Sequence, residues 1–522
     1  MLNSTKLGTT SIPKLLATMS APAMLSMLVQ SLYNIVDSIF VAQIGEAQLT
    51  AVSLAYPIQM LVFAFAIGIA IGTSSLISRR LGEGKLAEAS RAAQTGLFFA
   101  LISSAFFALF GYGISLGFLM LFTSDPAMLD MSVSYLAIVT SVSVGVFVEL
   151  FCSRTMQSMG NMIIPMISQL IGAITNIILD PIMIFGLIGF PALGVMGAAI
   201  ATVSGQVLSM IFMLIMVAVK KFDIQIFFKK FRLKFSTVKE IFRVGLPTMF
   251  QNAISSFLLT IMNALLIAFS QTAVAVYGVY YKLNSFVFMP CFGLNQGALP
   301  IYGYNYGAGN KKRFSKTVRL TLSVAIFLNC MGLLVFCLAP VQLLELFSAS
   351  ANMIAIGVSA LRIISFSFPA AAVSITFVAM YMAIGKGSHA FIITLLRQFV
   401  LVLPFAVLLG KFVNLDALWA SFAIGEYATA IIYIPLTVVI VNKMFAKKMK
   451  YVEDGFLTSP IVINSTIMGD EVPLPKEEKQ KNFDSFSNAV ENNSDSYRTV
   501  EVFSDFKESD QNAVGGANTE EK

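Results

Sequence analysis

The chain is a series of long apolar stretches separated by short polar breaks or breaks that contain glycine or proline. A helix that crosses the hydrocarbon core of a bilayer needs about 20 mostly apolar residues. The pattern therefore predicts membrane-spanning helices at 15–41, 51–78, 92–122, 128–153, 162–187, 195–219, 241–268, 275–303, 316–346, 353–383, 390–411 and 416–442. We expect an all-α polytopic membrane protein with 12 transmembrane helices.

Composition supports a membrane protein, because apolar residues make up 57% of the 522 residues and charged residues only 12%. A soluble domain carries about twice that share of charge. The C-terminal stretch 451–522 differs from the rest: it is rich in aspartate and glutamate, whereas lysine and arginine predominate before it. This stretch also has too few apolar residues to fold alone. We predict a disordered acidic cytoplasmic tail at 451–522.

Basic residues gather in every second loop between the predicted spans. The loops after the even-numbered spans contain Arg79, Arg80, Lys85 and Arg91, then Arg154, then the segment 220–243, then Lys311, Lys312, Arg313, Lys316 and Arg319, and last Lys386. The loops after the odd-numbered spans contain no lysine or arginine apart from Lys411. Because basic loops stay on the cytoplasmic side, we expect both termini in the cytoplasm and the protein in the plasma membrane.

The sequence contains an internal repeat. One constant shift, which places Pro22 on Pro247, also aligns five pairs of glycines, far more than chance: Gly68 with Gly293, Gly72 with Gly297, Gly82 with Gly307, Gly84 with Gly309 and Gly160 with Gly385. Each repeat holds six spans, so both copies have the same orientation. We therefore predict two parallel six-helix lobes around a central cleft. The expected parts are an N-lobe at 1–219, a basic linker at 220–240, a C-lobe at 241–450 and the tail.

Few ionisable residues lie inside the predicted spans, and Asp180 is the most informative of them. Asn176 and Asp180 are four residues apart and so share a helix face. Hard oxygen ligands of this kind suit Na⁺ or a proton and not a soft metal. We predict a cation-coupling site at Asp37, Asn176, Asp180 and Thr202. Alternatively, Asn176 and Thr202 make ordinary interhelical hydrogen bonds. Pro22 bends the span of Asp37, as a moving hinge or as a fixed kink.

Three further residues are candidates for the wall of a substrate cleft: Tyr33, Lys282 and Glu426. Lys282 lies midway along its span, where it either faces the cleft or compensates the charge of Glu426. Glu149 and Arg154 are about one helical turn apart, and we expect them to form a local ion pair.

Several segments resemble the multidrug and toxic compound extrusion (MATE) family, specifically its DinF-like and prokaryotic multidrug branch. They are residues 32–45, 78–84 and 176–181, together with the repeat glycines, and the resemblance covers about residues 10–445. It implies that Asp37, Asn176, Asp180 and Thr202 form the cation site of the N-lobe. Other branches use an acid in span seven, but here Met262 stands at the repeat equivalent of Asp37.

The resemblance implies an antiporter, not an enzyme, that exports organic and often cationic drugs in exchange for H⁺ or Na⁺ by alternating access. No nucleotide-binding loop or zinc-binding motif stands in the sequence, and we expect no cofactor. The expected partners are small organic molecules and membrane lipids, not nucleic acid, and we expect a monomer. Two alternatives stay open. One is a lipid-linked precursor flippase with a basic cleft of Lys282, Arg362 and Arg397; the other is a receptor or scaffold that signals through the acidic tail.

Overall fold

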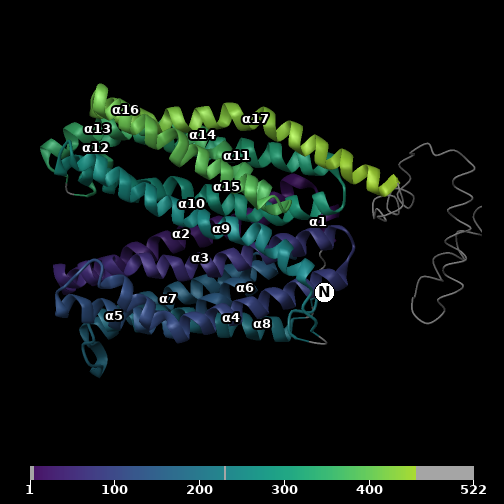
Figure 1. Cartoon of the computed structure of the whole chain (residues 1–522), viewed down its shortest axis with the longest axis horizontal. Coiled ribbons are helices and arrows are strands. Elements are labelled where there is room, and N and C mark those ends of the chain that lie inside the picture. Colours follow the sequence, from purple (N-terminus) through teal and green to yellow (C-terminus); the bar gives the residue numbers. More distant parts are fainter. Residues whose placement is uncertain (1–4, 221, 229–230, 348, 454–522) are drawn as a thin grey trace, which may run out of the picture. The chain divides into compact units, whose positions relative to one another are not determined.

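The computed structural model describes residues 5–220, 222–228, 231–347 and 349–453. Its elements in this part of the chain are helices (Figure 1). They are α1 (Lys6–Thr9), α2 (Ile12–Ile44), α3 (Glu46–Gly82), α4 (Leu86–Leu119), α5 (Pro126–Ser141), α6 (Val144–Ser158), α7 (Ile163–Phe185), η1 (Leu187–Gly189), α8 (Val195–Val219), α9 (Phe235–Ile267), α10 (Gln271–Gly307), α11 (Lys311–Leu338), α12 (Pro340–Glu345), α13 (Ala351–Ser365), α14 (Phe368–Ala383), α15 (Gly387–Leu395), η2 (Leu396–Val402), α16 (Leu403–Phe412) and α17 (Leu415–Glu453). The predicted disordered tail begins at 451, but α17 continues as a helix to Glu453; the rest of the tail, from 454 onward, lies outside the described residues.

The helices confirm the all-α polytopic class. Among the described residues, nine helices are long and apolar enough to cross a membrane, or eleven if the bent pairs α5–α6 and α13–α14 each form one span. The remaining predicted span, 275–303, lies within α10, which is 37 residues long but carries several tyrosine, asparagine and glutamine residues among its apolar ones. The expected number of 12 therefore depends on counting this more polar helix as a span.

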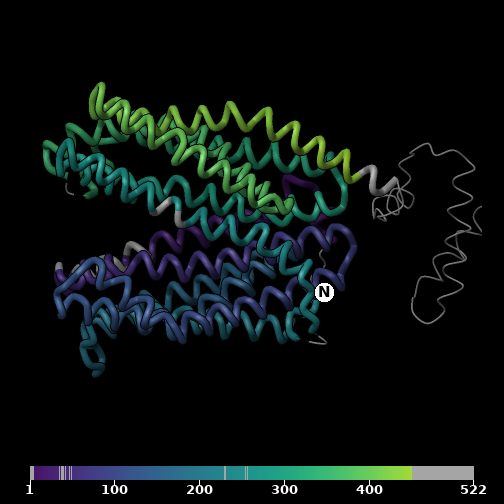
Figure 2. The backbone as a smooth tube through the Cα atoms, in the orientation of Figure 1, coloured from purple at the N-terminus to yellow at the C-terminus, as the bar shows by residue number. Residues whose placement is uncertain are grey.

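The two repeats have matching geometry. α3 and α10 each contain 37 residues, and they begin at equivalent positions of the repeat, Glu46 and Gln271. The bends within the pairs α5–α6 and α13–α14 are 46° and 49°. Gly84 and Gly309, in equivalent turns, both have a φ of 73°, a left-handed conformation that favours glycine. In Figures 1 and 2 the purple-to-blue helices of the first repeat form one group and most helices of the second repeat form another.

α3 and α10 cross near their C-terminal ends in a two-fold arrangement. A Cβ atom on Gly307 would lie 2.1 Å from the backbone oxygen of Arg79, and one on Gly82 would lie 2.0 Å from that of Tyr304. Arg79 and Tyr304 are equivalent positions of the two repeats, so each repeat makes the same contact with the other. α2 also packs against α10, and α3 against α9. Glycine is required at the crossing because a larger residue would push the two backbones apart.

Ion pairs join elements of both repeats at the same end of these helices. Arg80 lies 2.7 Å from Glu240 of α9 and 2.7 Å from Glu83, which follows α3. The Nζ atom of Lys448 in α17 lies 3.5 Å from Glu83 Oε1 and donates hydrogen bonds to two backbone oxygens of α10. Burial opposes ionisation of Glu83, but Lys448 and Arg80 outweigh it and hold the pKa of this carboxyl below its ordinary value. α3, α9 and α17 are thereby tied together.

Candidate functional site

Two glycines bring α7 and α8 close together. A Cβ atom on Gly205 of α8 would lie 2.7 Å from the backbone oxygen of Gly172 in α7. Asn176 follows Gly172 by about one turn, and Thr202 precedes Gly205 by about one turn. The contact between the two backbones therefore sets the polar side chains of Asn176 and Thr202 at the same level of the helix pair.

Asn176, Asp180 and Thr202 form one hydrogen-bonded group. Asn176 Nδ2 donates to Asp180 Oδ1 over 3.1 Å and to Thr202 Oγ1 over 3.4 Å. Asn176 is 3% exposed and Asp180 is fully buried. A carboxylate in such a place is costly unless hydrogen bonds or a cation compensate its charge. The structure thus brings together three of the four residues that the sequence assigns to the cation site.

The fourth residue, Asp37, belongs to α2, which packs against α7. The side chain of Asp37 lies outside the described residues. Tyr33, on the same helix, is half-buried. Pro22 also lies inside α2, and Ser26 Oγ donates a hydrogen bond of 3.0 Å to its carbonyl oxygen. The first, fifth and sixth predicted spans are therefore neighbours, which the sequence alone could not establish.

The ligands offered by this group fit a hard cation. Asn176 Oδ1 is buried, and within the described part of the chain no donor reaches it. The carboxylate of Asp180 and the hydroxyl of Thr202 add two further kinds of oxygen ligand within the same group. Oxygen ligands of this kind suit Na⁺, and a carboxylate can also carry a proton. The residues can therefore hold either of the two predicted coupling ions.

Glu149 of α6 continues the polar lining of these helices. Its Oε1 atom accepts hydrogen bonds from Ser153 at 2.7 Å and from Ser168 at 3.4 Å. Arg154 donates instead to Gln157 at 3.1 Å. The expected ion pair between Glu149 and Arg154 is therefore wrong. The reason is helix geometry, because residues five apart project roughly 140° away from each other around the axis.

The C-lobe contains a partly buried ion pair that the sequence reasoning missed. Arg397 Nη1 lies 2.8 Å from Glu426 Oε1, and the two side chains are 17% and 12% exposed. Ser374 Oγ donates to the second carboxylate oxygen over 3.1 Å. Arg397 lies in η2, a π-helical segment, which is a feature often found at functional sites. The repeat gave one indication of this polar position, because Ser374, which bonds to Glu426, is the repeat equivalent of the buried Glu149.

Lys282 does not compensate the charge of Glu426, because Arg397 does so. The Lys282 side chain is exposed on α10, and its Nζ atom lies 6.0 Å from the ring centroid of Phe347. One of the two interpretations left open for Lys282 is therefore wrong.

Aromatic side chains of α10 pack against aromatic side chains of α17, the helix that carries Glu426. The rings of Tyr277 and Trp419 are stacked with centroids 6.3 Å apart, and Tyr280 and Phe422 lie 6.2 Å apart. Tyr277, Tyr280 and Trp419 are at most 5% exposed, so these side chains belong to the packed core of the C-lobe.

A chain of repeated membrane-spanning helices, with a buried carboxylate in one repeat and an ion pair in the other, has the architecture of a polytopic membrane transporter. The family model for MatE matches residues 22–182 and 247–408, and the two matches begin at the equivalent prolines of the repeat, Pro22 and Pro247. The chain belongs to the MatE family, and it is a MATE-type membrane transporter.

The chain aligns with almost the whole length of its curated relatives. A multidrug export protein MepA from Staphylococcus haemolyticus (strain JCSC1435) is 25% identical over 446 residues, which cover 85% of this chain and 97% of the relative. The MepA protein from Staphylococcus saprophyticus is 26% identical over 437 residues, covering 83% and 95%.

Solved structures share the fold. One is the outward-facing conformation of a multidrug resistance MATE family transporter of the MOP superfamily. The two chains superpose with a TM-score of 0.80 and share 25% sequence identity. The match covers 84% of this chain and 98% of the solved one. A MATE in complex with MaL6 also has a TM-score of 0.80 and 25% identity, with 84% and 99% covered.

Proposed function

We propose that this transporter exports organic compounds in exchange for H⁺ or Na⁺ by alternating access. Two observations support the proposal. Its relatives are named multidrug export proteins, and a buried carboxylate stands among oxygen ligands at Asn176, Asp180 and Thr202. The second observation carries the coupling, because an ionisable group inside a membrane span is costly and commonly marks an ion pathway.

In this mechanism the N-lobe holds the driving ion. Asp180 and Asp37 supply the negative charge, and Asn176 Oδ1 and Thr202 Oγ1 complete the ligands. The ion and the substrate must stabilise different arrangements of the helices, since a ligand shifts an equilibrium only by its differential affinity for the two states. Pro22 is the candidate hinge of α2, because proline weakens the helix where it stands.

The substrate would contact the apolar walls between the two lobes. Tyr33, Lys282 and Glu426 are the polar candidates there. Such walls accept varied amphiphiles, because large apolar side chains supply most of the affinity and few polar groups restrict the shape.

We place the protein in the plasma membrane with both termini in the cytoplasm, in keeping with the basic loops. We expect Asn464 and Asn492 to stay unglycosylated in a eukaryotic secretory membrane, and a glycan on either residue would contradict an even number of spans.

A lipid-linked precursor flippase is less well supported. That function needs a basic cleft for pyrophosphate, but Arg397 is paired with Glu426. Arg362 donates to the backbone oxygen of Cys337 over 3.2 Å. A receptor that signals through its tail would not need the buried Asp180.

The test is export by purified protein reconstituted in liposomes under an imposed Na⁺ or pH gradient. Asp180→Asn and Asp37→Asn keep the size of each side chain but remove its charge and its capacity to bind H⁺ or Na⁺. We expect folded, inserted protein whose export falls to the rate of protein-free liposomes. Glu149→Gln is the matched control, because Glu149 is also a buried acid but bonds to Ser153 and Ser168 outside the group. Near wild-type export by both aspartate variants would refute the assignment.

A further inference from the structure

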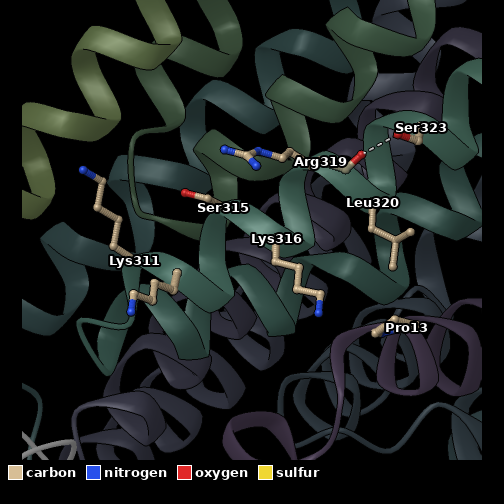
Figure 3. Close-up of a pocket in the computed structure, with 8 residues that line it drawn as sticks. Pro13, Lys311, Ser315, Lys316, Arg319, Leu320 and Ser323 are labelled. Carbon is tan, nitrogen blue, oxygen red and sulfur yellow. Dashed lines mark hydrogen bonds between the residues drawn. The ribbon is translucent and has the colours of Figure 1, made fainter.

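A basic groove opens where α11 begins. It has a volume of about 690 Å³ and is lined by Pro13 of α2 and by Lys311, Lys312, Ser315, Lys316, Arg319, Leu320 and Ser323 of α11. Figure 3 shows the labelled α11 side chains projecting from one helix, with Pro13 supplied by a separate segment. Four of the eight lining residues are basic and none is acidic. The groove is therefore a concentrated positive site to which both repeats contribute.

The positive charge of the groove has no partner within the described part of the chain. Lys312, Lys316 and Arg319 are exposed, and none of them forms an ion pair there. Elsewhere at this end of the protein, Arg80 and Lys448 are paired with acids. Like charges held this close repel one another, so an anionic ligand would stabilise the groove.

The same face of α11 becomes apolar further along the helix. Continuing from Arg319 and Ser323 at intervals of three or four residues, it presents Phe327, Met331, Leu334 and Leu338, which are 63%, 50%, 56% and 79% exposed. Residues at these intervals share one face of a helix. A single exposed stripe thus runs from a basic end to a long apolar part.

The equivalent face in the first repeat is covered by the chain itself. Ser315, Arg319 and Ser323 correspond to Ser90, Gln94 and Phe98 of α4. Ser90 Oγ accepts from the backbone of Gln225, Gln94 donates to the backbone oxygen of Phe227, and Phe98 packs on Phe231 with centroids 5.4 Å apart.

The connector between α8 and α9 therefore occupies that position in the N-lobe. In the second repeat the corresponding residues, 447–453, continue helix α17 instead. Among the described residues, no connector covers the face of α11, which is rich in basic residues.

We propose that the groove binds the headgroup of an anionic phospholipid, whose acyl chains lie along the apolar stripe of α11. The lysines and Arg319 would bind the phosphate, as basic pockets between membrane helices do. Phe327, Met331 and Leu334 would contact the chains. The stripe favours a lipid over a soluble acidic peptide or free phosphate, because only a lipid matches both the charged and the apolar part. The lipid would also touch Pro13 and so link the two repeats.

The experiment measures lipid binding to the full chain in uncharged detergent by native mass spectrometry. The probes are dioleoylphosphatidylglycerol, dioleoylphosphatidylcholine, inorganic phosphate and hexaglutamate. Lys316→Gln combined with Arg319→Gln removes two charges from the groove. Arg232→Gln combined with Lys234→Gln is the matched control, since both residues are exposed and lie on the same side of the protein. This binding assay needs no transport, so its result is independent of the proposed export function.

Wild-type protein should bind phosphatidylglycerol in preference to phosphatidylcholine. One membrane-proximal base is worth about a fivefold change in affinity, so the groove variant should bind phosphatidylglycerol about 30-fold more weakly. The control variant should bind it as the wild type does. Equal binding of both lipids by the wild type, or an equal loss in both variants, overturns the proposal. The assignment to a lipid is overturned if inorganic phosphate binds as tightly as phosphatidylglycerol. It is also overturned if hexaglutamate displaces bound phosphatidylglycerol.

Discussion

Removing one partner of the Arg397–Glu426 pair should destabilise the C-lobe strongly. The charged atoms are 2.8 Å apart, so they attract each other by about 6 kcal/mol at an effective dielectric constant of about 20. Part of this attraction offsets the loss of water around both groups. Glu426→Gln leaves the Arg397 guanidinium without its counter-charge, and Arg397 Nε already has no partner among the described residues. Breaking such a pair from one side costs about 3–5 kcal/mol.

Removing both charges should cost far less. In Arg397→Gln combined with Glu426→Gln, no unpaired charge stays in the membrane, and replacing a buried pair by neutral groups is often close to neutral in free energy. We therefore expect each single variant to unfold at a clearly lower temperature than the double variant. Lys282→Gln is the control, because its exposed side chain does not pair with Glu426, and it should leave the unfolding temperature unchanged.

The assay is thermal unfolding in detergent, followed by tryptophan fluorescence. The chain has one tryptophan, and this residue, Trp419, is fully buried, stacked on Tyr277 and placed about two turns before Glu426 in α17. Its emission therefore reports on the region that the variants perturb. A double variant that loses as much stability as the two single variants added together would refute the reasoning, because the two charges would then contribute independently.

Two further predictions concern the end where the repeats meet. Glu83→Gln should lower the unfolding temperature near neutral pH. Because neighbouring cations depress the pKa of Glu83 in the folded state, its stabilising effect is full above the ordinary value of 4.5 and is lost as the pH falls through the lowered pKa of the folded protein; a difference from wild type that does not shrink as the pH falls below 4.5 would contradict this. Gly307→Ala should destabilise the crossing of α3 and α10 by about 1–3 kcal/mol, since its Cβ would meet the backbone of Arg79. Gly113→Ala, in open space on α4, is its control in the same unfolding measurement, and equal stability of the two variants would count against a tight crossing.

Much of the fold could be predicted because its causes are local. A bilayer requires long apolar helices, so the spans follow from the sequence. The repeat appeared because glycine is needed at turns such as Gly84 and Gly309 and at the crossing of α3 with α10. Asn176 and Asp180 were paired correctly on one helix face because positions four apart are set by the period of the helix. The apolar pattern also predicted the span 275–303, although the tyrosine, asparagine and glutamine residues of α10 reduce its apolar content.

Contacts between helices could not be read from the chain in the same way. The sequence contained Arg397, Glu426 and Lys282 as membrane charges, but only packing decided that Arg397 is the partner of Glu426. Arg154 stood close to Glu149 in sequence, yet Ser153 and Ser168 bond to the carboxylate. Ion pairs depend on distances of a few ångströms between side chains, which spacing along separate helices does not determine.

By itself, then, the sequence determined what each residue needs from its own helix and from the membrane: apolar spans, the period of the repeat and the face shared by Asn176 and Asp180. Tertiary structure decided which helices meet. The approach of Gly172 to Gly205 brought Thr202 to Asn176, and the open face of α11 turned a basic loop into a groove with an apolar stripe. The reason is physical: periodicity and hydropathy act over a few residues, whereas packing joins residues far apart in the chain, and only side-chain fit selects among the possible neighbours.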